Sequence, residues 1–263
     1  PGYKSKIHIP DIEYFNMSEK EVRMAKAAQF KEFPTIEQIR KVIFSMPTET
    51  EVEKRDQALI AFTLLTGMRD SAIASLSLKH IDTSRDPVLI RQDPNEVRTK
   101  FSKAINTYFF PVGDDIRDIA LDWIRYLKEE KLYGLNDPVF PRTKIGQDEN
   151  LSFANHGLEP FHWSNATPIR KIFKRAFTNA GLKYYTPHLF RNTLAELGQK
   201  ICKTPEQLKA WSQNLGHENV LTTFTSYGNI DPHRQGEVMK KILEYNTSED
   251  TMLAQILEFI KKY

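Results

Sequence analysis

The segment that most constrains the fold is residues 53–66, EKRDQALIAFTLLT, a strongly apolar run that ends at Gly67. Its length and apolar character predict a buried helix. In the motif L-T-G-M-R that closes the run, Arg69 stands where this core helix emerges into a turn. Rigidly placed charges at such positions often serve functional sites. The plainer alternative is an arginine that only interacts with the dipole at a helix C-terminus.

Helix-start signals divide most of the remaining chain. Thr35 followed by Gln38 is a capping box that predicts a helix through about Met46, and T-P-E-Q at 204–207 repeats the signal with proline at the first helical position. Asp70-Ser71 can cap a helix over 72–80. Further helices are expected over 18–30, 114–132, 168–181, 188–201, 219–227, 232–244 and 249–262.

Only one region favours strands. The stretches VLIRQ (88–92) and VRTKFSKAINTYFFPV (97–112) are rich in β-branched and aromatic residues, with a turn expected near 101–105. The fold class predicted from the whole pattern is mainly α with a small antiparallel β-sheet (α+β).

Composition excludes few classes of function, but charge, cysteine count and apolar runs each bear on the partners and the location. The 263 residues carry 37 basic and 34 acidic side chains, a net charge of +3 that is only weak evidence for a nucleic-acid partner. The single cysteine, Cys202, cannot form an internal disulfide, which fits a reducing cytoplasm. No apolar run approaches the ~20 residues that span a bilayer, so no membrane association is expected.

The last third of the chain holds two histidines and a second arginine in short motifs. His188 and Arg191 in H-L-F-R are spaced i,i+3, so on a helix both could meet the same phosphate. Taken alone, the motif fits a capping histidine beside a surface arginine equally well. His217, after Leu215-Gly216, could cap the preceding helix or bind a metal with His188. No Cys/His/Asp cluster of ligand spacing accompanies it, so metal is the weaker interpretation.

Tyr227 follows ten residues after His217. Most tyrosines are packing residues, and a phenol is a poor nucleophile unless a base takes its proton or positive charges stabilise the phenolate. Gly228 directly after it permits a break in the helix. Small polar residues rather than an apolar stripe surround it, namely Thr222, Thr223, Thr225 and Ser226.

Together these motifs carry a resemblance. T-G-M-R, the lysine-bearing strand pair, H-L-F-R-N-T-L-A and L-G-H-E-N-V-L-T-T-F-T-S-Y stand in the order and spacing of the tyrosine recombinases, the phage-integrase family, over residues 34–245. The resemblance implies that Arg69 and Arg191 clamp the scissile phosphate, while His217 hydrogen-bonds it. It implies that Tyr227 attacks the phosphorus, with His188 as general base, to give a 3′-phosphotyrosyl link and a free 5′-hydroxyl.

In this family a lysine of the strand pair protonates the leaving 5′-oxygen. Lys100 in R-T-K-F-S-K best matches that position, and Lys103 is the alternative. Both could instead be solvated lysines that touch the DNA backbone. The sequence departs from the family at Ala72, where Glu is usual, and at Asn192, where His is frequent. Asp70 offers an acidic group near Arg69, but on another face of the turn.

The function implied is a site-specific DNA recombinase or integrase, of a mobile genetic element, acting on a double-stranded DNA recombination site without metal or cofactor. A type IB-like DNA topoisomerase and a catalytically decayed DNA-binding module are the alternatives. Positive charge on one helix and on the segment just after it suggests contacts to DNA phosphates. The plainer alternative is a helix face that is only solvated. The residues are Arg170, Lys171, Lys174, Arg175 and Lys183, to which Lys103 is added.

Three parts of the chain are expected. Residues 1–33 would be an N-terminal arm or linker, 34–245 the catalytic domain, and 246–263 a C-terminal helix. That helix has an apolar stripe, which would pack on its own domain or dock in trans to join a homotetramer on DNA. Members of the family also carry an N-terminal helical domain, for which 33 residues are too few. The chain is therefore expected to be either a truncated catalytic fragment or a minimal form, and its start at Pro1 rather than methionine favours truncation. The location expected is the cytoplasm, on the nucleoid when bound to DNA. The stripe consists of Met252, Leu253, Ile256, Leu257 and Ile260.

Overall fold

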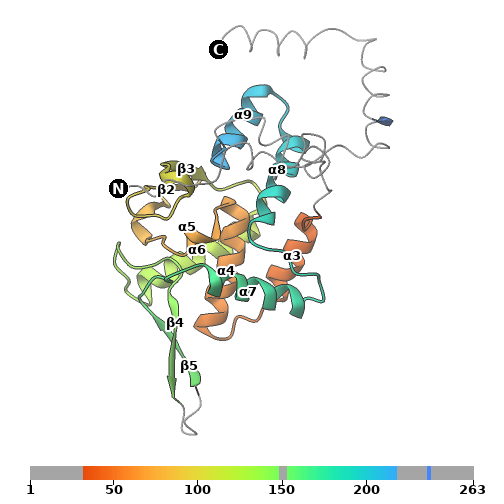
Figure 1. The fold of residues 1–263 in the computed structure, drawn as a ribbon. Helices are drawn as coiled ribbons and strands as arrows, with labels where there is room; N and C mark the ends of the chain where they lie inside the picture. The colour runs from red at the N-terminus through yellow and green to blue at the C-terminus, as the bar shows by residue number, and fades with distance from the viewer. Residues whose placement is uncertain (1–31, 148–152, 218–235, 238–263) are drawn as a thin grey trace, which may run out of the picture.

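The computed structural model of the chain describes residues 32–147, 153–217 and 236–237. Its helices gather into one body, and a small sheet lies at its side (Figure 1). The helices are α3 (Ile36–Ser45), α4 (Glu51–Thr66), α5 (Asp70–Ile73), α6 (Asp114–Glu129), α7 (Thr167–Asn179), α8 (Leu189–Ile201) and α9 (Pro205–Asn214). The strands are β1 (Ile81–Asp82), β2 (Leu89–Gln92), β3 (Ile105–Tyr108), β4 (Arg142–Gln147) and β5 (Phe153–Glu159).

Helix α4 is the centre of the core, as its apolar sequence predicts. A capping box of Thr50 and Glu53 starts it, and Gly67 ends it in the left-handed conformation at φ 58°. Phe62 on α4 is fully buried and meets Phe109 and Phe140 edge-on, with ring centroids 5.8 and 5.3 Å apart. Helices α3, α6 and α8 pack against α4, so the turn after Gly67 starts from a rigid base.

The strands form two antiparallel sheets. Strands β1, β2 and β3 lie in that order, with Ile90 of β2 opposite Thr107 of β3. The connection from β2 to β3 contains a 3₁₀ turn, η2 (Lys100–Ser102). Strands β4 and β5 make a separate hairpin that projects from the body (Figure 1).

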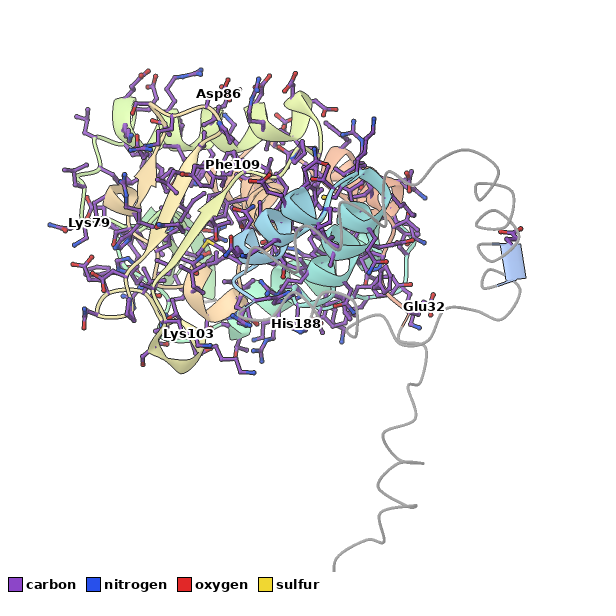
Figure 2. The ribbon with its side chains drawn as sticks, turned by 90° about the horizontal axis from the view of Figure 1, so that it is seen from above. Glu32, Lys79, Asp86, Lys103, Phe109 and His188 are labelled. Atoms are coloured by element: carbon purple, nitrogen blue, oxygen red, sulfur yellow. The ribbon has the colours of Figure 1, made fainter. Side chains whose placement is uncertain are left out.

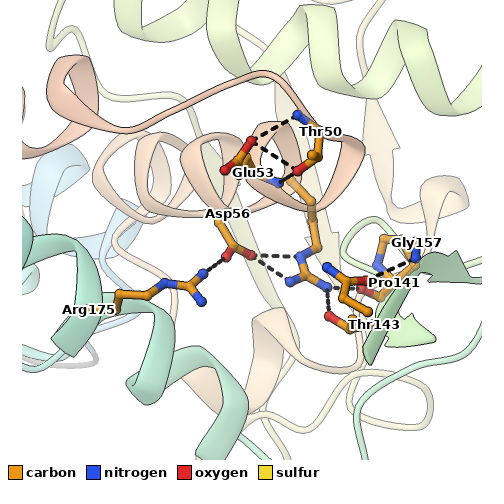
Figure 3. A network of polar contacts seen from close by, with 9 residues as sticks. Thr50, Glu53, Asp56, Pro141, Thr143, Gly157 and Arg175 are labelled. Carbon is orange, nitrogen blue, oxygen red and sulfur yellow. Dashed lines mark hydrogen bonds and ion pairs between the residues drawn. The ribbon is translucent and has the colours of Figure 1, made fainter. Parts of the chain in front are cut away.

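Buried polar groups of α4 hold the base of this hairpin (Figure 3). Arg55 Nη1 donates to the carbonyl oxygen of Pro141 at 2.8 Å and to Thr143 Oγ1 at 3.1 Å. On the other strand, the Leu158 N–H donates to Glu51 at 2.7 Å. These satisfied donors and acceptors fix the base of the hairpin to the core, and Leu158 of β5 is itself buried there.

The predicted fold class, mainly α with a small antiparallel sheet, is confirmed. The helices expected at 35–46, 53–66, 114–132, 168–181, 188–201 and 204 onward are present with ends that shift by at most three residues. Gly236–Glu237, inside the helix expected over 232–244, are helical. The helices expected over 18–30, 219–227 and 249–262 lie outside the described residues.

Two expectations need correction. The helix expected over 72–80 is wrong, because α5 ends at Ile73 and a separate 3₁₀ turn, η1, covers Leu78–His80. The backbone there bonds to another segment instead, since the Leu78 N–H donates to the carbonyl oxygen of Asp137 at 3.0 Å. The strand expected from residue 97 begins only at Ile105, and the β4–β5 hairpin was not expected at all.

Candidate active site

Arg69 lies at the N-terminus of α5, three residues beyond the end of α4. Its side chain is half-buried, and burial lowers the pKa of its guanidinium. Within residues 32–147, 153–217 and 236–237, no group makes a hydrogen bond or ion pair with this guanidinium. A half-buried charge without a counter-ion is costly, so this position favours binding of an anion.

Arg191 lies in the first turn of α8 and is only 6% exposed. Its Nη1 donates to the carbonyl oxygen of Gly67 at 2.6 Å, and its Nη2 donates to that of Leu215 at 2.5 Å. Nη2 also lies 3.0 Å from Nε2 of His217. One guanidinium therefore joins the end of α4, the start of α8 and the end of α9.

Two glycines, Gly67 and Gly216, allow the ends of α4 and α9 to pack closely around Arg191. Gly67 has φ 58°, and a Cβ there would lie 2.9 Å from side-chain atoms of both Leu194 and Leu215. Gly216 has φ 68°, and a Cβ there would lie 2.9 Å from Ile105. Both positions have a left-handed backbone that other residues rarely adopt, and an added Cβ would also displace a neighbouring side chain, which accounts for glycine in L-T-G-M-R and L-G-H.

The two histidines share one electropositive environment. Burial, followed by the charges of Arg191 and Arg69, lowers the pKa of His217 to about 4. Desolvation and the same two arginines also hold the pKa of His188 below its ordinary value. Both imidazoles are therefore neutral at physiological pH, in which form a nitrogen can accept a proton or a hydrogen bond.

The two candidate lysines lie on either end of the η2 turn rather than on a strand. Lys100 opens η2, and its charge contributes to the lowered pKa of His188. Lys103 follows η2 and lines a hollow of about 470 Å³ with Gly216 and His217. In Figure 2, Lys103 and His188 lie along the same edge of the body. The structure thus brings both lysines toward the arginine and histidine cluster.

Helix α7 carries four of the basic residues predicted to contact DNA, and all four are exposed. Arg170 forms an ion pair with Asp70, Nε to Oδ2 at 2.7 Å, which places the start of α7 beside the turn at Arg69. Arg175 pairs with Asp56 in the first half of α4 (Figure 3). Within the described ranges, no carboxylate pairs with Lys171 or Lys174.

The other predicted residues lie away from the arginine and histidine cluster or outside the described residues. Lys183 pairs with Glu32 at 2.7 Å. Ala72, which stands where Glu is usual in the family, is buried, and Asp70 is directed to Arg170. Tyr227 and the apolar stripe of the C-terminal segment lie outside the described residues.

Asn214 was missed by sequence reasoning. Its side-chain amide accepts from the N–H of Tyr108 at 2.6 Å and donates to the carbonyl oxygen of the same residue at 2.9 Å. The amide thus pairs with the edge of β3 as another strand would, and it fixes the end of α9 just before His217. No local signal marks this role, because the two residues are 106 positions apart.

Two features are absent from the described residues. No helix there is long and apolar enough to cross a membrane. No group of three or more His, Cys, Asp and Glu side chains there could hold a metal ion.

Comparison with known proteins points to one family. A model of the phage integrase family matches residues 33–234. Tyrosine recombinase XerC of Corynebacterium efficiens is 24% identical over 180 residues, which are 68% of this chain and 48% of that protein. Tyrosine recombinase XerC of Pseudomonas putida is 23% identical over 172 residues, 65% of this chain and 47% of that protein. The chain therefore spans about half the length of the curated relatives it matches.

Solved structures agree in fold. The crystal structure of XerA recombinase is similar with a TM-score of 0.53 at 16% identity, over 85% of this chain and 65% of that one. The Tn1549 transposon integrase in complex with circular intermediate DNA is similar with a TM-score of 0.52 at 17% identity, over 86% and 69% of the two chains. The family match covers most of the chain and the same fold recurs in these structures, so the chain belongs to the phage integrase family.

Proposed function

We propose that this chain is the catalytic domain of a site-specific DNA recombinase or integrase, which cleaves and rejoins DNA strands through a 3′-phosphotyrosyl intermediate. The observation that carries the proposal is the half-buried Arg69 guanidinium, which has no counter-ion among the described residues and faces an environment shared with Arg191 and two neutral histidines. Such a cluster binds a phosphodiester and offers a base beside it.

The roles follow from the chemistry of each group. Arg69 and Arg191 bind the non-bridging oxygens of the scissile phosphate and stabilise the charge that develops on them. His188, kept neutral by its surroundings, takes the proton of the Tyr227 hydroxyl as that oxygen attacks phosphorus. His217 hydrogen-bonds the phosphate, and its contact with Arg191 orients both groups.

The leaving group needs a proton. As the bond from phosphorus to the 5′-oxygen breaks, the ammonium of Lys100 gives a proton to that oxygen and becomes a neutral amine. Lys103 is the alternative donor, since it lines the hollow beside His217. The reverse reaction, attack of a 5′-hydroxyl on the phosphotyrosine, reseals the strand without a nucleotide cofactor, because the phosphodiester bond energy is retained.

Partners and setting belong to the same proposal. The substrate is a double-stranded recombination site. The similarity in fold to a transposon integrase supports the proposal that the recombinase serves a mobile genetic element. Residues 246–263 would join protomers into a homotetramer on that DNA, and the reaction would take place in the cytoplasm. Residues 34–245 would form the catalytic unit, preceded by an arm over 1–33.

A covalent-adduct experiment tests the chemistry. A duplex with a nick just beyond the cleavage site loses a short fragment after cleavage, so the phosphotyrosyl adduct is trapped and is seen as a shifted band on a denaturing gel. We expect an adduct with the wild type and with Tyr133→Phe, a matched tyrosine change after α6, and none with Tyr227→Phe.

The outcomes separate the alternatives. An adduct that survives Tyr227→Phe would remove the tyrosine assignment, and absence of any adduct in the wild type would favour a decayed DNA-binding module. Relaxation of any supercoiled plasmid by a monomer would favour the topoisomerase alternative over recombination. Cleavage that EDTA abolishes would contradict the metal-independent mechanism.

A further inference from the structure

The approach to Lys100 is held in place by its neighbour Arg98. The Arg98 N–H donates to Ser75 Oγ at 2.9 Å, and the Arg98 carbonyl oxygen accepts from Ser71 Oγ at 3.3 Å. Its guanidinium reaches the other way, donating to the carbonyl oxygens of Trp163, at 2.6 Å, and Ser164. Arg98 is thus bonded through its backbone to one segment and through its side chain to another.

These contacts act on a connection that would otherwise have many conformations. Residues 93–104 join β2 to β3, and fixing a backbone costs entropy for each residue that is ordered. Val97 anchors the connection to the core, where it is 1% exposed. Arg98 comes next, and Lys100 follows two positions later at the start of η2. Arg98 therefore fixes the chain two positions before the lysine, and the N–H of Thr99, between them, donates back to the carbonyl oxygen of Val97 at 2.7 Å.

The serines that hold Arg98 belong to the segment that begins with Arg69. Arg69 is the N-terminal cap of α5, Ser71 lies in its first turn, and Ser75 lies just beyond its end. The same short segment thus carries a proposed phosphate ligand and holds the loop of the proposed proton donor. A shift of this segment would move both groups together, which keeps the distance between them constant.

We propose that Arg98, with Ser71 and Ser75, is a positioning residue that sets the Lys100 ammonium against the leaving 5′-oxygen. This inference rests on the proposed function, and in particular on proton transfer from Lys100 to that oxygen. Positioning matters because a proton donor must lie within hydrogen-bond reach, and a misplacement of about 1 Å can cost on the order of 100-fold in rate.

The test replaces the 5′-bridging oxygen of the scissile phosphate with sulfur. When the bond from phosphorus to sulfur breaks, the thiolate leaves with the electron pair and needs no proton near neutral pH. A defect in proton donation therefore disappears on the sulfur substrate, whereas a defect in folding, DNA binding or nucleophilic attack remains. Single-turnover cleavage is measured on matched oxygen and sulfur duplexes at saturating enzyme.

Four variants are compared with the wild type. Arg98→Ala removes the side-chain bonds, and the double variant Ser71→Ala/Ser75→Ala removes the backbone bonds without changing charge. Lys100→Ala removes the donor itself, and Arg125→Ala, an exposed arginine paired with Asp122 on α6, is the matched control. We expect Arg98→Ala and the double-serine variant to cleave the oxygen substrate roughly 10- to 100-fold more slowly. We expect both to cleave the sulfur substrate near the wild-type rate, as Lys100→Ala does, and Arg125→Ala to match the wild type on both.

Each contrary result has its own meaning. If Lys100→Ala is restored by sulfur but Arg98→Ala and the double-serine variant are equally slow on both substrates, the positioning role is wrong while the proton-donor role stands. If Arg98→Ala cleaves the oxygen substrate at the wild-type rate, the positioning role is likewise wrong. If sulfur fails to restore Lys100→Ala, the proposed donor is wrong, and Lys103→Ala on the same substrates tests its alternative.

Discussion

His217 shows how one residue depends on the charges around it. Its imidazole contacts Arg191 and feels Arg69, and with burial these charges bring its pKa to about 4. In an unfolded chain the pKa returns to the ordinary 6.5. The unfolded state therefore binds a proton that the folded state does not, at every pH between these two values.

The resulting prediction concerns stability against pH. Without DNA, the free energy of unfolding should fall as the pH falls from about 6.5 to about 4, with no further loss from this group below its folded pKa. His217→Gln, which keeps a hydrogen-bond acceptor for Arg191, should show a smaller difference in denaturation midpoint between about pH 7 and about pH 5 than the wild type. His156→Gln, an exposed histidine on β5, is the control. An unchanged difference in His217→Gln would contradict the assigned pKa direction.

Among the elements, the β4–β5 hairpin depends on a buried ionic group in α4. Arg55 and Asp56 are 3% and 1% exposed in their side chains and lie 2.6 Å apart, and Arg175 pairs with the same carboxylate. Burial raises the pKa of Asp56, while the two arginines oppose that rise. Removing Arg55 or Asp56 leaves the other as a buried charge without its partner.

Asp56→Ala should therefore be strongly destabilising. We expect a loss of roughly 3–5 kcal/mol in the free energy of unfolding, because Arg55 keeps its burial and loses its counter-ion. Chemical denaturation measures this loss. The control is Asp115→Ala, which breaks the partly exposed pair with Arg40 and should cost much less, because water screens an exposed ion pair. Equal losses for the two variants would show that the buried group contributes no more than a surface ion pair.

Elements whose signals are local are those that the sequence predicts well. At Thr35 and Thr204 the capping side chain and the N–H it accepts from are three residues apart, so each box is readable from four letters. The apolar run before Gly67 likewise predicts its own burial. The β4–β5 hairpin has no such signal, because Arg55 and Glu51 hold it from 86 and 107 positions away.

The residues of the candidate site likewise fall into those that a local motif predicts and those that only tertiary contacts reveal. Arg69, His188, Arg191 and His217 stand in short motifs, and the resemblance to a family predicts that they meet. Arg98 and Asn214 stand in no motif, and their roles depend on backbone groups of Trp163 and Tyr108 that only the tertiary structure brings near. The helix expected over 72–80 fails for a related reason, since the backbone of Leu78 bonds to Asp137 in preference to a local helix.

At the scale of the whole molecule, the basic residues of α7 divide into two groups. Arg170 and Arg175 are paired with Asp70 and Asp56, whereas Lys171 and Lys174 have no carboxylate partner in the part of the chain that the structure describes. Release of counter-ions from DNA makes affinity fall with salt, by a slope of about 0.9 for each phosphate contact.

Lys171→Ala/Lys174→Ala should therefore weaken DNA binding similarly on all sequences and reduce the slope of log affinity against log salt by up to about 2. Fluorescence anisotropy with a short duplex at several salt concentrations measures the slope. The matched control is Lys128→Ala, an exposed lysine in the last turn of α6, which should leave the slope unchanged. A wild-type slope in the double-lysine variant would place α7 away from the DNA.

The bonds of Arg191 to Gly67 and Leu215 have a consequence for synthesis of the chain. Gly67 and Arg191 are separated by 124 positions, and Leu215 comes 24 residues later still. A nascent chain leaves the ribosome from its N-terminus, so Arg69 is made long before the carbonyl groups that hold Arg191 are both available. Until then, Arg191 lacks its backbone partner at Leu215. On the proposed function, the phosphate-binding arrangement would therefore be complete only after residue 215 has been made.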